Sequence, residues 1–126
     1  MPKRTSIDIP GVHHNAPIPM GARVGNVVFS SGIMGTPPGG ALSEDPTEQA
    51  RQLFENIRVF MKEAGGTVED IGHMRVLLKD DSYRDPINAE WEKMFPDPNN
   101  RPARHSVQMP LRGAMLFQVE LTAVLG

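Results

Sequence analysis

Residues 45–66, DPTEQARQLFENIRVFMKEAGG, contain the clearest structural element of the sequence. Asp45 suits a helix N-cap, Pro46 suits the first helical position, and Glu48 completes a start that resembles a capping box. Gly65-Gly66 then provides a stop signal. Between these ends, apolar side chains recur on one helical stripe, at Ala50, Leu53, Phe54, Ile57, Met61 and Ala64. The stretch therefore predicts an amphipathic helix that lies on a sheet.

The segments on either side of this helix have strand patterns. Residues 26–33 carry the β-branched and aromatic run Val27-Val28-Phe29, and residues 71–79 alternate between apolar and polar side chains. A strand, a crossover helix and a second strand form a βαβ unit, so we expect these two strands to be parallel. Gly25-Asn26 predicts a tight turn before the first strand, and Thr5–Ile9 predicts at most a short edge strand.

A second helix and two final strands complete the predicted fold. Residues 80–95 place apolar side chains, including Trp91, at helical spacing. Residues 103–109 and 115–124 alternate as strands do, and we expect them to form a hairpin. The order β-β-α-β-α-β-β predicts a single α+β domain over residues 1–126, a mixed sheet with both helices packed on one face.

Composition excludes several classes of function. The 126 residues carry a net charge of −2, so no broad basic face is available for nucleic acid. The absence of cysteine removes disulfides and thiolate catalysis. No signal peptide and no membrane-spanning stretch is visible, which predicts a soluble cytoplasmic protein without a membrane partner.

The last strand has two different faces. Its odd positions, Met115 to Ala123, are apolar and should face the helices. Its even positions, which include Gln118, Glu120 and Val124, are too polar for a core and too apolar for plain solvent exposure. A face of this kind often lies against another subunit.

Two charged residues of the predicted hairpin stand out as a candidate site. A turn centred on Arg112 would place Arg104 directly opposite Glu120, and the same parity adds Ser106, Gln108 and Gln118 to their face. One interpretation is a simple cross-strand ion pair. The other is a small-molecule site in which Arg104 binds a carboxylate and Glu120 positions or activates a water.

Arg101 and His105, which lie near Arg104 in the sequence, are expected to have structural roles and no role in the site. Arg101, at the end of a loop rich in proline and asparagine, is expected to be solvated or to brace that loop. His105 is expected to point to the face opposite Arg104 and to be a packing residue.

Motifs along nearly the whole chain resemble the RidA/YjgF (Rid) family. The most specific is Pro102-Ala103-Arg104, followed by Gly113 and by Val119-Glu120. Residues 24–32, VGNVVFSSG, resemble the family's glycine-containing strand. The helical segments that resemble it are residues 49–57, QARQLFENI, and 88–91, NAEW.

This resemblance implies a chorismate-mutase-like fold assembled as a homotrimer, with one site at each subunit interface. It implies hydrolysis of reactive enamine or imine intermediates of amino acids to 2-oxo acids and ammonia, without a metal or other cofactor. By the resemblance, Arg104 binds the substrate carboxylate and Glu120 aligns the attacking water. Ser31, Asn88 and the backbone around Ser106 line the pocket.

The sequence departs from the family pattern at several pocket positions. Ile18 stands where a tyrosine is usual, and Ile33 where a glutamine is common. His105-Ser106 follows Arg104, where the family often has a serine or threonine followed by a threonine or cysteine. These residues predict a pocket that is more apolar on one side. The alternatives are a carboxylate-binding regulatory module without turnover and a deaminase of a larger unsaturated amino acid, such as an aminomuconate. A ribonuclease activity, also attached to this family, is disfavoured by the charge.

Overall fold

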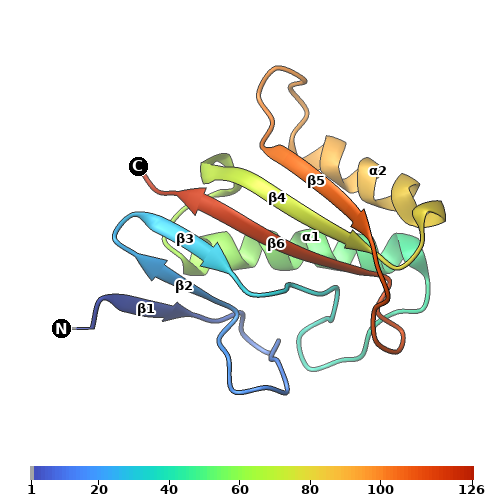
Figure 1. The fold of residues 1–126 in the computed structure, drawn as a ribbon, viewed down its shortest axis with the longest axis horizontal. Coiled ribbons are helices and arrows are strands. Elements are labelled where there is room, and N and C mark those ends of the chain that lie inside the picture. Colours follow the sequence, from blue (N-terminus) through green and yellow to red (C-terminus); the bar gives the residue numbers. More distant parts are fainter. Residues whose placement is uncertain (1) are drawn as a thin grey trace.

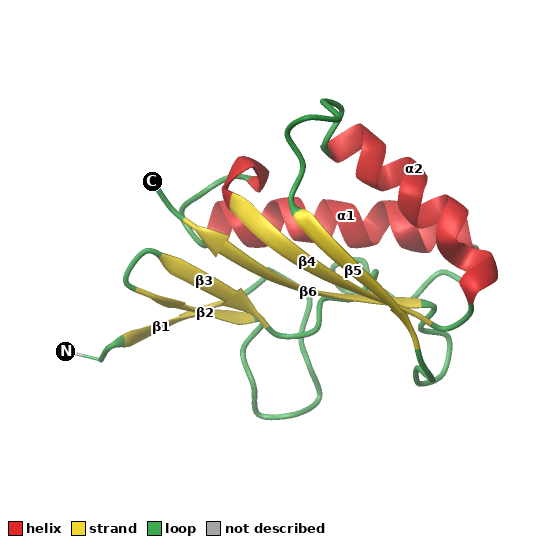
Figure 2. Ribbon diagram, turned by 45° about the horizontal axis from the view of Figure 1, so that its top comes forward, coloured by secondary structure: helices red, strands yellow, loops and turns green. Residues whose placement is uncertain are grey.

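A computed structural model describes residues 2–126 as a six-stranded mixed sheet with two α-helices on one of its faces (Figures 1 and 2). The predicted fold class is therefore confirmed. Short 3-10 turns occupy Val68–Asp70 and Asp81–Tyr83. In chain order the elements are β1 Arg4–Ile7, β2 Gly21–Val24, β3 Val27–Ser30, α1 Pro46–Glu63, β4 Ile71–Leu78, α2 Arg84–Met94, β5 Ala103–Gln108 and β6 Phe117–Val124.

The sheet order is β1-β2-β3-β6-β4-β5. Because β3 and β4 both run antiparallel to β6, they are parallel to each other, as the βαβ pattern predicts, with β6 between them. The tight turn between β2 and β3 is also confirmed, since Val24 pairs with Val27 and Gly25 has a φ of +59°. A positive φ at this turn position favours glycine. The expected edge strand is β1, which pairs with β2.

The predicted hairpin between the last two strands is wrong. β4 lies between them and pairs in parallel with β5 and antiparallel with β6. The reason is that β4, α2 and β5 form a second crossover unit, which delivers β5 to the outer edge of the sheet. Residues 109–116 then return the chain across β4 to the place of β6, as Figure 1 shows.

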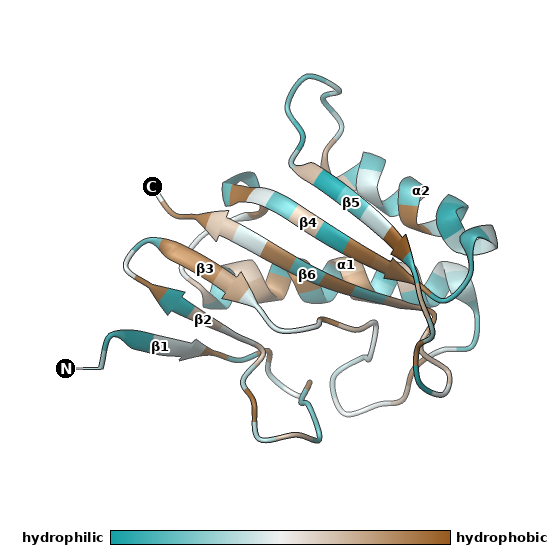
Figure 3. Ribbon diagram, viewed as in Figure 1, coloured by the Kyte–Doolittle hydropathy of each residue, from teal (hydrophilic) through white to brown (hydrophobic). Residues whose placement is uncertain are grey.

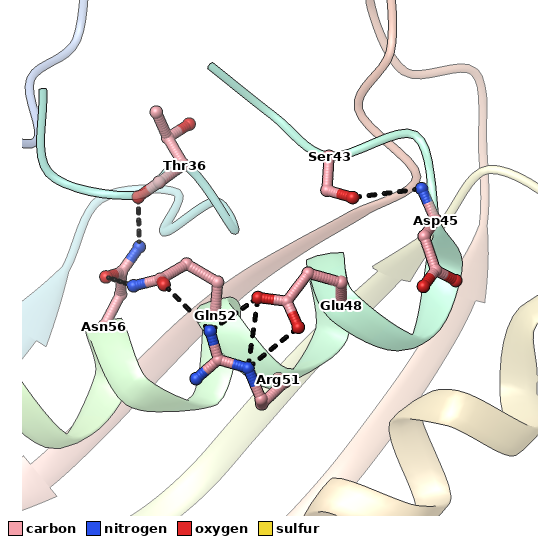
Figure 4. A network of polar contacts seen from close by, with 7 residues as sticks. All are labelled: Thr36, Ser43, Asp45, Glu48, Arg51, Gln52 and Asn56. Atoms are coloured by element: carbon pink, nitrogen blue, oxygen red, sulfur yellow. Dashed lines mark hydrogen bonds and ion pairs between the residues drawn. The ribbon is translucent and has the colours of Figure 1, made fainter. Parts of the chain in front are cut away.

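Helix α1 begins and ends close to the predicted residues, although its N-terminal contacts differ from a capping box. The Asp45 side chain accepts a hydrogen bond from the Thr47 N–H at 3.2 Å. Glu48 does not return a bond to Asp45. It accepts from the guanidinium of Arg51, one turn later, at 2.9 and 3.1 Å, while the Asp45 N–H donates to Ser43 (Figure 4). Gly65, with a φ of +91°, ends the helix.

The core fills the space between α1, α2 and one face of the sheet. The odd positions of β6 from Phe117 to Ala123 are almost fully buried, and Phe60 and Ile57 of α1 are completely buried. The even positions of β6 lie on the open face, where Val124 is 54% exposed and Phe29 of β3 is 46% exposed. Figure 3 shows the hydrophobic colouring that runs along β3. No helix within residues 2–126 has the length and apolar character needed to cross a membrane.

Two buried amides of α1 hold the loops that flank the sheet. Gln49, which is fully buried, donates from Nε2 to the carbonyls of Ser43 at 2.7 Å and Ala114 at 3.0 Å, and its Oε1 accepts from the Leu116 N–H at 2.8 Å. Asn56 donates to the carbonyls of Met34 and Thr36, both at 2.8 Å. These bonds fasten the segment after β3 and the segment before β6 to one helix.

Candidate functional site

Arg104 lies half-buried on β5, on the side of the sheet that the helices cover. Its register partner on β4 is Met74, which is completely buried. The Arg104 Nε donates to the Ser106 hydroxyl at 2.9 Å, and the guanidinium carbon lies 5.1 Å from the ring centroid of Trp91 on α2. The guanidinium is thus held between a strand and a helix.

The contact with Trp91 is one that sequence reasoning missed. Trp91 is 8% exposed and packs edge-on against Phe95, with ring centroids 4.8 Å apart and planes at 64°. Its helical spacing indicated a core residue, and it is one. The spacing of apolar residues along a helix does not indicate that the Arg104 guanidinium covers one face of the Trp91 ring.

The electrostatics of Arg104 are those of a cation that lacks a counterion. Burial lowers its pKa, and the positive charge of nearby Arg84 lowers it further. Four ion pairs occur within residues 2–126, each between residues one helical turn apart, and none includes Arg104. Because desolvation of an unpaired charge is costly, an anion that bound here would relieve that cost.

Glu120 lies on the opposite face of the sheet, which corrects the predicted pairing. Through β4, Arg104 aligns with Met74 and then with Leu121 of β6, on the helix side. Glu120 instead aligns with Arg75. Cross-strand neighbours share a face, so Arg104 and Glu120 are two strands apart and point away from each other.

The corrected register also moves the neighbouring polar residues. Ser106 and Gln108 stay on the side of Arg104, whereas Gln118 lies with Glu120 on the open face. His105 does lie opposite Arg104, but it is exposed and pairs in register with Arg75, so it is not a packing residue. Arg101 braces its loop as expected, since its Nε donates to the Phe95 carbonyl at 2.9 Å.

Glu120 stands in a shallow hollow of about 280 Å³ on the open face of the sheet. The hollow combines an apolar side with cationic and hydroxyl groups. Its lining comes from three strands of the sheet and comprises Phe29, Ser30, His73, Arg75, Glu120, Leu121 and Thr122.

The segment after β3 runs beside the middle of β6. Ser31 donates from its hydroxyl to the Pro19 carbonyl at 2.8 Å and from its N–H to the Met20 carbonyl, also at 2.8 Å. Ser31 is therefore close to the loop that carries Ile18, whose side chain is 50% exposed. Ile33 exchanges backbone hydrogen bonds with Val119, and its side chain is completely buried in the core. The sequence had suggested that Ile33 makes the pocket more apolar, but a side chain buried in the core does not line a pocket.

The expected site residues thus form two groups on one chain. Arg104 and Ser106 are in contact on β5, and Asn88 is exposed on α2, one turn before Trp91. On the other side of the sheet, Glu120 on β6 lies beside the segment that carries Ser31. The first group offers a fork for an anion, and the second offers a carboxylate in a hollow.

Comparison with known proteins gives a consistent result. A model of the family described as Endoribonuclease L-PSP matches residues 15–125. The 2-iminobutanoate/2-iminopropanoate deaminase of Salmonella typhimurium is 37% identical over 111 residues, which cover 86% of this chain and 87% of that protein. A RutC family protein of Haemophilus influenzae is 38% identical over 89 residues, which cover 68% of each chain.

Solved structures agree with the fold. The crystal structure of Escherichia coli TdcF with bound serine superposes with a TM-score of 0.85 at 29% identity, and it covers 97% of this chain and 99% of that one. A Yersinia pestis protein of the Rid family, YyfA, superposes with a TM-score of 0.86 at 20% identity, over 97% and 99% of the two chains. The second likeness concerns the fold alone.

Proposed function

The chain belongs to the Endoribonuclease L-PSP family, the RidA/YjgF family that its motifs resemble, and on that premise we propose that it hydrolyses reactive imines of amino acids to 2-oxo acids and ammonia. The observation that carries the proposal is the half-buried, unpaired guanidinium of Arg104. Imino acids made from amino acids carry a carboxylate that such a fork can bind with two parallel hydrogen bonds. The similarity to a 2-iminobutanoate/2-iminopropanoate deaminase supports this class of substrate.

For one ligand to contact both groups of site residues, a second copy of the chain is needed. Within one subunit the sheet separates Arg104 from Glu120, so a single ligand can reach both only if they come from different subunits. We therefore expect a homotrimer in which the open face of one subunit, with Glu120 and exposed Phe29 and Val124, lies against the β5 edge of the next. An interface between unlike surfaces closes into a ring when the rotation allows it.

The proposed reaction begins with the imine held by its carboxylate on Arg104. A water positioned by Glu120 adds through its oxygen to the imine carbon, and the proton that this water loses passes to the imine nitrogen. In the resulting carbinolamine, the hydroxyl proton passes to the nitrogen as the C–N bond breaks and the C=O bond forms, and ammonia and the 2-oxo acid leave. Because an imine carbon is already electrophilic, positioning the water and the carboxylate supplies much of the catalysis.

The remaining residues would shape the pocket. Ser106 orients Arg104 and offers its backbone to the ligand, and Asn88 supplies an exposed amide from α2. Ser31 and Ile18 would approach from the partner copy together with Glu120. The half-exposed Ile18 favours an apolar substrate side chain, as in 2-iminobutanoate, and also keeps open a larger unsaturated amino acid.

A second candidate is a module that binds a small carboxylate and does not turn it over. Ile18 favours this candidate, because an apolar side chain offers no hydroxyl to the reacting groups. The structure of the similar TdcF contains bound serine. Arg104 would bind the carboxylate in both functions, whereas Glu120 would position a water only in the enzyme.

One assay separates the two functions. A pyridoxal-phosphate-dependent threonine dehydratase generates 2-iminobutanoate, and the release of 2-oxobutanoate is followed with and without this protein. We expect the wild type to accelerate release and both Arg104→Ala and Glu120→Ala to abolish the acceleration. Arg101→Ala is the matched control, because Arg101 braces a loop three residues away. A wild type no faster than buffer across a panel of imino acids would refute the enzyme proposal.

A further inference from the structure

We propose that Trp91 is the positioning residue for Arg104, and that its ring face sets how tightly the site holds a carboxylate. This inference rests on the proposed role of Arg104 as the carboxylate ligand. It adds a residue on α2 to the binding machinery and gives the buried indole a task beyond packing.

The argument starts from what compensates the Arg104 charge in this structure. A carboxylate partner would neutralise it but would also occupy the guanidinium N–H groups. Trp91 instead presents the electron-rich face of its ring, which attracts a cation without accepting a conventional hydrogen bond. The charge is therefore stabilised in the free protein, and the donors remain available.

The second contact of Arg104, with Ser106, also leaves most of the guanidinium N–H donors free. Ser106 accepts from Nε at 2.9 Å, which uses one of the five N–H donors of the guanidinium. The four donors on the two terminal nitrogens are not used by this bond. One N–H from each of these two nitrogens forms the end-on edge that binds a carboxylate through two parallel hydrogen bonds. The Trp91 face and the Ser106 hydroxyl together fix the guanidinium and leave its binding edge free.

The indole is well supported for this role. Trp91 is only 8% exposed, and Phe95, the residue that follows the last residue of α2, packs edge-on against it with ring centroids 4.8 Å apart. The ring therefore cannot turn away without disturbing the core. A flexible arginine that rests on a fixed surface loses less rotamer freedom when the ligand arrives, and such preorganisation raises affinity.

The test measures binding of 2-oxobutanoate, the expected product, by isothermal titration calorimetry. Trp91→Leu should weaken binding by roughly 5- to 30-fold, the range of a partly desolvated cation–π contact. Trp91→Phe and Trp91→Tyr, which keep an aromatic face, should lose less. The uncharged amide of 2-oxobutanoate should show no such ranking, because it does not need the guanidinium charge.

Coupling to Arg104 separates positioning from structural support. In an Arg104→Ala background, Trp91→Leu should have no further effect on 2-oxobutanoate binding. In the deaminase assay, Trp91→Leu should raise KM and leave kcat nearly unchanged, since the carboxylate is held equally before and during the reaction. A merely structural residue would lower the fraction of folded protein and thus kcat. If Trp91→Leu does not fold, the ranking of the Phe and Tyr variants against the wild type takes its place.

The outcomes distinguish this inference from the function on which it rests. If Arg104→Ala weakens binding but all Trp91 variants bind like the wild type, the role of Trp91 is refuted and the function stands. Equal loss for the leucine and the aromatic variants would also refute it. If Arg104→Ala itself binds 2-oxobutanoate normally, the proposed function fails first.

Discussion

Arg104→Ala and Glu120→Ala subunits, each inactive alone, should restore activity when they assemble into the same trimer. The two side chains of one chain lie on opposite faces of the sheet, so under the proposed function they would serve two different sites. In a mixed trimer, an Arg104 from a Glu120→Ala subunit can meet a Glu120 from an Arg104→Ala subunit. Such a site is complete although neither chain is.

The recovered activity follows from the arrangement. Around a closed ring with one kind of contact, every trimer made of two copies of one variant and one of the other has a single junction with the intact combination. Purified mixed trimers should therefore show about one third of the wild-type rate per subunit. Co-expression with two different affinity tags, followed by purification on both, isolates them. The release of 2-oxobutanoate is then measured as above.

Trimers made of a single variant, and trimers of doubly tagged wild type, are the controls for the mixed trimers. Each variant co-expressed with a differently tagged copy of itself should stay at the buffer rate, and doubly tagged wild type should keep its full rate. If Arg104 and Glu120 of the same chain completed one site, no mixed trimer would contain an intact one. Mixed trimers at the buffer rate would thus refute the division of the site between subunits.

Three further outcomes follow from the structure. Gln49→Ala removes three hydrogen bonds and should cost about 3 kcal/mol, or roughly 10 °C in the thermal midpoint by circular dichroism, whereas exposed Glu55→Ala on the same helix should change it little. Light scattering should give about 42 kDa, three copies of 13.9 kDa, and Phe29→Glu, which puts a charge on the open face, should reduce this to one copy. Gly21→Ala would drive a methyl group into the ring of Phe60, and urea unfolding should report a loss of about 1–3 kcal/mol.

Local patterns predicted most of the elements. The apolar stripe of α1, the proline at its first position and Gly65 at its end each act within a few residues, and α1 forms within one residue of the expected bounds. Alternation likewise predicted which side of β6 meets the helices. These signals depend on periods of 3.6 and 2, which neighbouring elements do not alter.

The partners of each strand could not be predicted in the same way. Alternation along β5 and β6 is satisfied by pairing with either neighbour, and the five residues between the two expected strands, 110–114, suggested a hairpin. In the structure eight residues, 109–116, join the two strands. Those residues can extend over about 26 Å, far more than the roughly 10 Å across two strand spacings, so passing β4 is easy. Since the facing of Arg104 was inferred from that hairpin, the error in strand order carried over to the site. Trp91 was missed for a related reason, because its contact joins α2 to a strand whose position was wrong.

The amides of Gln49 and Asn56 have a consequence for how this chain can diversify. Both bind main-chain groups of the loops, the carbonyls of Met34, Thr36, Ser43 and Ala114 and the N–H of Leu116. A main-chain carbonyl is offered by every amino acid, and an N–H by every one except proline. Gln49 and Asn56 thus anchor the loops through bonds that do not depend on which side chains the loops carry. The exposed positions of these loops are free to exchange side chains, through mutation or deliberate grafting, while the anchor points stay in place. Gly35, between the anchored carbonyls of Met34 and Thr36, is an exception, because a Cβ there would collide with the Gln49 carbonyl.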